Sequence, residues 1–200
     1  MNIIRHRRNT YQELAEIGTD HGAEIDIRSQ GRDLVLHHEP YEAGTKFEKW
    51  LENYRHGTLI LNVKEEGLED RCLELMSKHG IKDFFFLDQS FPFLVKTSRT
   101  GESRCAVRVS EFETIDTALS LAGKVEWVWV DCFTKFPLDI DSAAQLKENG
   151  FKLCIVSPEL QGRMEQSDTD IIVKAMTDAG VVPDAICTKF PERWLNQFDS

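Results

Sequence analysis

The sequence predicts an α/β fold, built as a compact single-domain (β/α)8 TIM barrel over residues 1–200. Short β-rich runs alternate with helical patterns from end to end, and most of these runs are continuously apolar. Continuous apolar runs are typical of strands covered on both faces, as in parallel sheets. Eight strands with crossovers would use about 25 residues per unit, at the small end of this fold's range. A doubly wound open sheet is the alternative, but the sequence has no Gly-rich dinucleotide loop and no Walker motif.

The expected strands are short segments rich in β-branched, aromatic and other apolar residues. They are Asn2–His6, Ala23–Arg28, Thr58–Lys64, Phe84–Leu87, Cys105–Val109, Trp127–Asp131, Lys152–Val156 and Asp184–Cys187. The turn-forming segment Ser29–Asp33 leads into Leu34–His38, so we expect a hairpin-like excursion after the second strand.

The expected helices are the amphipathic stretches between these strands. They are Tyr11–Gly18, Phe47–Tyr54, Leu68–His79, Thr114–Ala122, Ser142–Asn149 and Asp168–Ala179. The last four stop directly before a glycine, which is a common end for a helix. We expect the apolar segment Phe190–Phe198 to cover the lower end of the barrel or to contact a second subunit.

The composition excludes some classes of partner. The chain has 34 acidic and 24 basic residues and a net charge of −10. Such a surface disfavours nonspecific nucleic-acid binding, which needs Lys and Arg to neutralise phosphates, and docking on anionic lipid surfaces. It allows a small anionic substrate, because local residues and a metal ion can override the global field.

The cysteines and the hydropathy pattern favour a cytoplasmic protein that does not span a membrane. The chain shows no secretory signal pattern and no apolar run near the roughly 20 residues of a membrane span. The five cysteines have no CxxC spacing, so we expect small buried hydrophobes in a reducing compartment rather than a zinc site. The oligomeric state, monomer or homodimer, stays open.

Polar residues with useful chemistry fall at the expected C-terminal strand ends, where active sites of such barrels lie. Strand residues two apart point the same way, so Glu24 and Asp26 share a face, and so do Asn62 and Lys64. His6 ends the first strand. If the even positions face inward, His6, Asp26, Asn62 and Lys64 meet at the mouth of the barrel, with Glu24 one layer below.

Each of these residues also has a purely structural interpretation. His6 could be a partly exposed residue at a strand end, and Lys64 could be a surface lysine. Asp131, at the end of the sixth strand, could cap the next helix. Glu24 and Asp26 could be solvated on an edge strand, but their apolar neighbours look packed, and inward carboxylates are costly unless paired or bound to metal.

Several segments resemble the glycerophosphodiester phosphodiesterase family, part of the phosphatidylinositol phospholipase C-like phosphodiesterase superfamily. The specific ones lie in the first quarter of the chain and are His6-Arg7, Asn9-Thr10, Gly22-Ala23-Glu24-Ile25-Asp26 and Leu34-Val35-Leu36-His37-His38-Glu39-Pro40. Less specific ones follow, at Leu61–Lys64, Phe86–Phe91 and Pro183–Pro191.

The resemblance implies a barrel with a divalent metal ion, Mg²⁺ or Ca²⁺, at its mouth. It implies that His6 and His38 act as acid and base, since imidazoles titrate near neutral pH. It further implies that Glu24 and Asp26 bind the metal ion, and that Arg7 holds the phosphate. Oxygen ligands suit both ions.

Other residues complete the implied site. Lys64 would help to neutralise the phosphate, and Asp131 is a candidate for a substrate contact. Asn62 stands where the family has a third acidic ligand, so the site loses one negative charge. We expect weaker metal binding or a ligand borrowed from elsewhere, with Glu65 and Asp131 as candidates. Arg8 replaces the glycine of the family's His-Arg-Gly motif.

Three hypotheses of function follow. The first is a metal-dependent phosphodiesterase that cleaves a small, glycerophosphodiester-like or lipid-derived diester. The second is a degenerate barrel that binds a phosphorylated ligand or a protein partner without hydrolysis. The third keeps the barrel but has phosphatase activity, or lyase activity that forms a cyclic phosphate.

Overall fold

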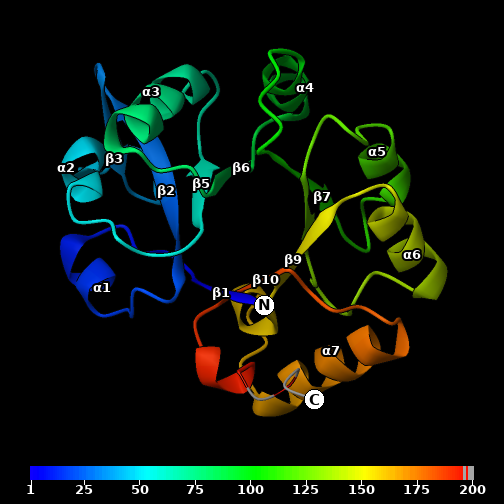
Figure 1. The fold of residues 1–200 in the computed structure, drawn as a ribbon. Coiled ribbons are helices and arrows are strands. Elements are labelled where there is room, and N and C mark those ends of the chain that lie inside the picture. The colour runs from blue at the N-terminus through cyan, green and yellow to red at the C-terminus, as the bar shows by residue number, and fades with distance from the viewer. Residues whose placement is uncertain (196, 198–200) are drawn as a thin grey trace. The chain divides into compact units, whose positions relative to one another are not determined.

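The computed structural model describes residues 1–195 and 197, so Phe198 of the predicted C-terminal cover lies outside the described residues. The chain forms two compact units (Figure 1). The N-terminal unit is Ile4–Cys105, and the C-terminal unit joins Met1–Ile3 to Ala106–Ser200. Strand β1 (Asn2–Arg5) is therefore divided between the two.

Parallel strands in chain order form the sheet of the N-terminal unit. The end of β1 pairs with β2 (Gly22–Gln30), β2 with β5 (Leu59–Val63), and β5 with β6 (Phe84–Leu87). The short strand β3 (Asp33–Leu36) pairs antiparallel with the end of β2, and β4 (Thr45–Lys46) pairs antiparallel with β3. The hairpin-like excursion expected after the second strand is therefore present.

The helices of the N-terminal unit follow the strands as crossovers. They are α1 (Tyr11–Ala15), α2 (Phe47–Leu51), α3 (Glu69–His79) and α4 (Phe91–Arg99). Thr10 caps α1 and exchanges hydrogen bonds with Glu13 in a capping box. Helix α4 is not among the expected helices, although Ser90 and a proline in its first turn are ordinary start signals.

The paired strands β2 and β5 form the core of this unit. The residues of β5 are all buried, and those of β2 from Gly22 to Ile27 are buried as well. A side-chain carbon on Gly22 would lie 2.3 Å from the Thr58 carbonyl oxygen, which is far too close. Only glycine fits at the start of β2, where the strand approaches the chain just before β5, and the register of the two strands aligns Asp26 with Asn62.

The C-terminal unit repeats the parallel pattern. Its strands β7 (Ala106–Val109), β8 (Trp127–Val130), β9 (Lys152–Val156) and β10 (Ala185–Thr188) pair in chain order. Its helices are α5 (Ile115–Leu119), α6 (Ile140–Glu148), α7 (Gln166–Asp178) and the short 3₁₀ helices η1 (Pro158–Gln161) and η2 (Pro191–Arg193). The indole of Trp194 is buried and donates a hydrogen bond to Ser157 Oγ at 2.9 Å.

The predicted α/β class with parallel strands in chain order is confirmed. Closure of the strands into a full (β/α)8 barrel and a single domain over residues 1–200 stay predictions. The five cysteines are buried and none forms a disulfide, as expected. Among the described residues, no helix has the length and apolar character needed to cross a membrane.

Candidate functional site

Two carboxylates lie inside the N-terminal unit, on one face of β2. The side chains of Glu24 and Asp26 are almost completely buried, with residue exposures of 1% and 0%. Asp26 pairs in register with Asn62 of the neighbouring strand β5. Buried carboxylates are costly unless donors or cations surround them, so the partners of these two residues define the site.

Glu24 has mostly neutral partners. Its Oε2 accepts a hydrogen bond from the Arg7 backbone amide at 2.8 Å and lies 3.9 Å from His6 Nε2. Its Oε1 accepts a hydrogen bond from Asn62 Nδ2 at 2.8 Å. Burial, and secondarily the charge of Asp26, raises the pKa of Glu24 to about 7. The carboxylate therefore lies in a place where additional positive charge would be strongly favourable.

Asp26 has more direct partners. Asn9 Nδ2 donates to Asp26 Oδ2 at 2.9 Å, and the Asp26 backbone amide donates to Asn9 Oδ1 at 2.8 Å. Lys64 Nζ lies 3.1 Å from Oδ1, and Arg7 Nε lies 3.7 Å from Oδ2. These contacts join the end of β1, β2 and the end of β5 around one carboxylate.

The side-chain oxygen of Asn62 adds an acceptor that is unpartnered in the described part of the chain, beside the two carboxylates. Asn62 is 6% exposed, and its Oδ1 is buried with no hydrogen-bond partner among the described residues. Within those same residues, no three His, Cys, Asp or Glu side chains gather in a way that could hold a metal ion. A divalent cation would therefore need the amide oxygen in addition to Glu24 and Asp26. The unsatisfied oxygen and the high pKa of Glu24 fit such an ion.

His38 follows β3, in the same unit. Its Nδ1 lies 2.6 Å from Glu39 Oε1, and its backbone oxygen accepts hydrogen bonds from the Arg28 guanidinium at 2.9 and 3.1 Å. The His38 ring holds the pKa of Glu39 below its usual range. The ring of His37 instead contacts the backbone of Glu39. The two neighbouring histidines thus have different environments, and the one that is paired with a carboxylate is His38.

Lys64 has a second partner, Asp88, which is not among the expected site residues. Its Nζ lies 3.4 Å from Asp88 Oδ2, and Asp88 follows β6 with a left-handed backbone, φ 58°. Asn9 also escaped notice as a site residue. Both residues lie in loops that follow parallel strands, and this position is the one sequence signal that could have found them. Glu65, the proposed substitute ligand, is instead engaged by Arg28 and Ser29.

Asp131 belongs to the C-terminal unit. Its carboxylate accepts hydrogen bonds from Arg108 Nη1 and Gln161 Nε2, both at 2.6 Å. Both oxygens therefore have protein donors. Its predicted contact with substrate stays a prediction.

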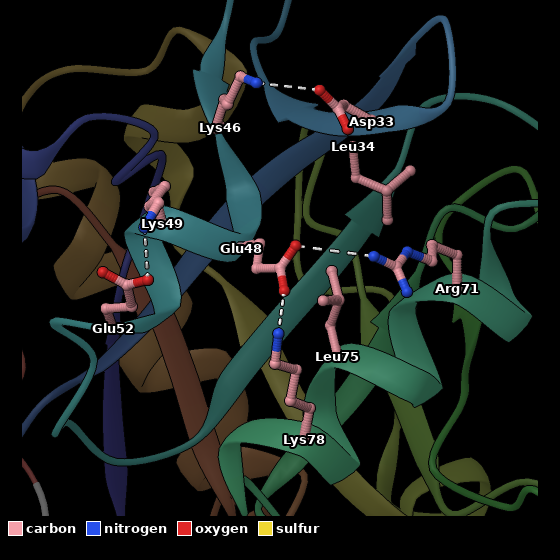
Figure 2. A pocket seen from close by; sticks show the side chains of 9 residues that line it. All are labelled: Asp33, Leu34, Lys46, Glu48, Lys49, Glu52, Arg71, Leu75 and Lys78. Atoms are coloured by element: carbon pink, nitrogen blue, oxygen red, sulfur yellow. Dashed lines mark hydrogen bonds and ion pairs between the residues drawn. The ribbon is translucent and has the colours of Figure 1, made fainter.

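A separate cavity of about 330 Å³ lies among β3, β4, α2 and α3 of the N-terminal unit. Figure 2 shows Glu48 between Arg71 and Lys78, with Lys46 paired to Asp33. None of the residues predicted for the catalytic site lines this cavity. Its charged side chains pair with one another, so the cavity does not alter the assignment of the candidate site.

No protein-family model matches the sequence, and no curated protein matches it. Solved structures do resemble the fold. A glycerophosphodiester phosphodiesterase from Agrobacterium tumefaciens strain C58 has a TM-score of 0.66 and 14% sequence identity, over 96% of this chain and 97% of that chain. A second protein from that strain, provisionally named a glycerophosphoryl diester phosphodiesterase, has a TM-score of 0.66 and 12% identity, over 94% and 93% of the two chains. The predicted resemblance to this family is thus confirmed as a likeness of fold.

Proposed function

We propose that this protein is a metal-dependent phosphodiesterase that cleaves a small, glycerophosphodiester-like or lipid-derived diester, and that its strands close into a (β/α)8 barrel. The observation that carries the proposal is the grouping of His6, Arg7 and Lys64 around two buried carboxylates, Glu24 and Asp26. The likeness of fold to glycerophosphodiester phosphodiesterases supports the same reaction class.

The histidines would move protons. His6 Nε2 lies 3.9 Å from the Glu24 carboxylate, and its ring would serve as one acid–base group. His38 is oriented by Glu39 and would serve as the second acid–base group. One histidine would protonate the leaving alcohol while the other accepts a proton from the attacking hydroxyl or water.

The cationic side chains would bind the phosphodiester. Arg7 is partly exposed and presents a guanidinium that matches two phosphoryl oxygens. Lys64 adds a second positive charge that Asp26 and Asp88 hold in place. A Mg²⁺ or Ca²⁺ ion held by Glu24, Asp26 and Asn62 would supply further stabilisation of negative charge on the phosphoryl group.

The test is turnover of bis(p-nitrophenyl) phosphate and of glycerophosphodiesters by the purified full chain with added Mg²⁺ or Ca²⁺. His6→Ala and His38→Ala should each lower kcat by about 10²- to 10⁴-fold. His79→Ala, which changes a histidine on α3, is the matched control and should keep full activity. Phosphorus NMR of the products separates hydrolysis from formation of a cyclic phosphate. Full activity in both site variants would contradict the mechanism.

One observation favours a second function, binding of a phosphorylated ligand without hydrolysis. Asn62 stands beside Glu24 where a third carboxylate would strengthen a metal site. This alternative expects saturable binding of a phosphodiester with no product in the same assay.

A further inference from the structure

We propose that Asn9 is a positioning residue that orients the Asp26 carboxylate for the cation of the candidate site. The proposal rests on the proposed function, because it concerns the same cation. It assigns a role to a residue that neither binds the cation nor contacts the phosphate. Two hydrogen bonds between Asn9 and Asp26 support this role. The Asn9 side chain donates one to the Asp26 carboxylate and accepts the other from the Asp26 backbone amide.

The chain after β1 reaches these contacts through an unusual turn. Arg7 has a positive φ of 51°, a left-handed conformation that non-glycine residues seldom adopt. The turn directs the backbone amides of Arg7 and Arg8 to Glu24, where they donate to its side chain and to its carbonyl oxygen, both at 2.8 Å. Asn9 continues the same segment one residue further and contacts Asp26. Three consecutive residues thus fasten the end of β1 to the two acidic residues of β2.

The chemistry of Asn9 suits this place better than that of most other residues. Its amide donates from Nδ2 to Asp26 Oδ2 and accepts at Oδ1 from the Asp26 backbone amide. A carboxylate could accept but could not donate, and an alanine could do neither. Asn9 therefore holds the Oδ2 atom of the Asp26 carboxylate, and the other oxygen, Oδ1, faces Lys64.

The orientation of Asp26 matters for a cation. The Asp26 side chain is completely buried and lies in register with Asn62, whose Oδ1 has no partner among the described residues. Partners that orient a ligand without touching the metal commonly change metal affinity by about 10- to 100-fold when they are removed. Asn9 carries no charge, so its replacement leaves the net charge of the site unchanged. A loss of affinity would then report orientation rather than a lost charge.

The experiment is isothermal titration of the chelator-treated full chain with Mg²⁺ and with Ca²⁺, for wild type, Asn9→Ala and Asn9→Ser. The expected result is a loss of affinity of about tenfold or more in both variants. Asn9→Ser keeps a small polar group beside the Asp26 amide and serves if Asn9→Ala does not fold, as judged by thermal unfolding.

Thr10→Ala is the matched control. Thr10 is the next residue and caps α1 through Glu13, without a contact to Asp26. Its replacement should lower the melting temperature and leave the cation affinity within twofold of wild type. An unchanged affinity in the folded Asn9 variants would overturn the positioning role while the proposed function stands. Wild-type protein that binds neither ion would overturn both.

Discussion

Both units contain buried acids on or shortly after parallel strands, but the surroundings of those acids differ. In the C-terminal unit, the Asp131 carboxylate accepts hydrogen bonds from the side chains of Arg108 and Gln161. The Glu159 carboxylate accepts hydrogen bonds from the hydroxyls of Ser157 and Thr188 and from the backbone amide of Lys189. Each carboxylate oxygen there has a protein donor. Such acids are fully occupied within the protein and stabilise the fold.

In the N-terminal unit each carboxylate oxygen of Glu24 and Asp26 also has a donor or a cation beside it, but a neighbouring amide oxygen has neither within the described part of the chain. Burial raises the pKa of Glu24 to about 7, and the neighbouring Asn62 Oδ1 has no partner among the described residues. A folded protein seldom retains such costs without a ligand or a catalytic use. The difference between the units teaches that burial of an acid does not identify a functional site, whereas a raised carboxyl pKa beside an unpartnered amide oxygen points to one.

The largest expected change is a loss of folding stability caused by a substitution in the C-terminal unit. Glu159→Ala would leave the buried hydroxyls of Ser157 and Thr188 and the amide of Lys189 without their acceptor. We expect a loss of about 3 kcal/mol in the free energy of unfolding, measured by urea denaturation. Cation affinity should not change. A loss well below 1 kcal/mol, or a large loss of cation affinity, would break the distinction between the two units.

Glu24 should make the metal-free protein less stable as pH rises. Its pKa rises from an ordinary value of 4.5 to about 7 on folding, so between these values the folded state binds a proton that the unfolded state has released. The protonated Glu24 carboxyl stabilises the folded state by at most about 3 kcal/mol. This contribution is fully present below pH 4.5 and is lost as pH rises through about 7.

Urea unfolding in a chelating buffer across this pH range measures the effect. Glu24→Gln cannot titrate and provides the reference, because all other groups remain. The difference between wild type and the variant should fall with pH. A difference that is constant or that increases would mean that Glu24 is not held in a charge-disfavouring environment.

Asn62→Asp would place a third carboxylate beside Glu24 and Asp26 and should increase cation affinity. The new carboxylate would lie beside Glu24 and Asp26 and raise affinity for Mg²⁺ or Ca²⁺ by roughly tenfold or more, since ligand charge is a main determinant of affinity. Titration calorimetry measures the change, and Asn53→Asp on the surface after α2 is the control for added charge. Equal affinity in Asn62→Asp and wild type would argue that the amide does not face the cation.

The sequence predicted the periodic features of the fold well. Buried parallel strands produce continuous apolar runs, so β1, β2 and β5 were recognisable, and alternation along β2 placed Glu24 and Asp26 on one face. Helix α4 was missed because its sequence, Phe91–Arg99, begins with apolar residues that resemble a strand or core segment.

The candidate site was predictable where a residue lies on a strand and less so where a loop carries it. Asn9 reaches Asp26 only because Arg7 adopts a left-handed conformation, and Lys64 meets Asp88 through a second left-handed residue, Asp88 itself. The angle of Arg7 does not follow from residue type, since arginine seldom adopts this region, whereas aspartate is among the non-glycine residues that adopt it more often. The packing of loop residues against the strands therefore had to come from the structure.

The most direct test of the central claim is calorimetric titration of the chelator-treated protein with Mg²⁺ and Ca²⁺, beside the double variant Glu24→Gln, Asp26→Asn. The claim is that these buried carboxylates, with Asn62, form a cation site. It predicts saturable binding by wild type that disappears in a folded double variant. Absence of binding by wild type, or unchanged binding by the variant, would contradict it.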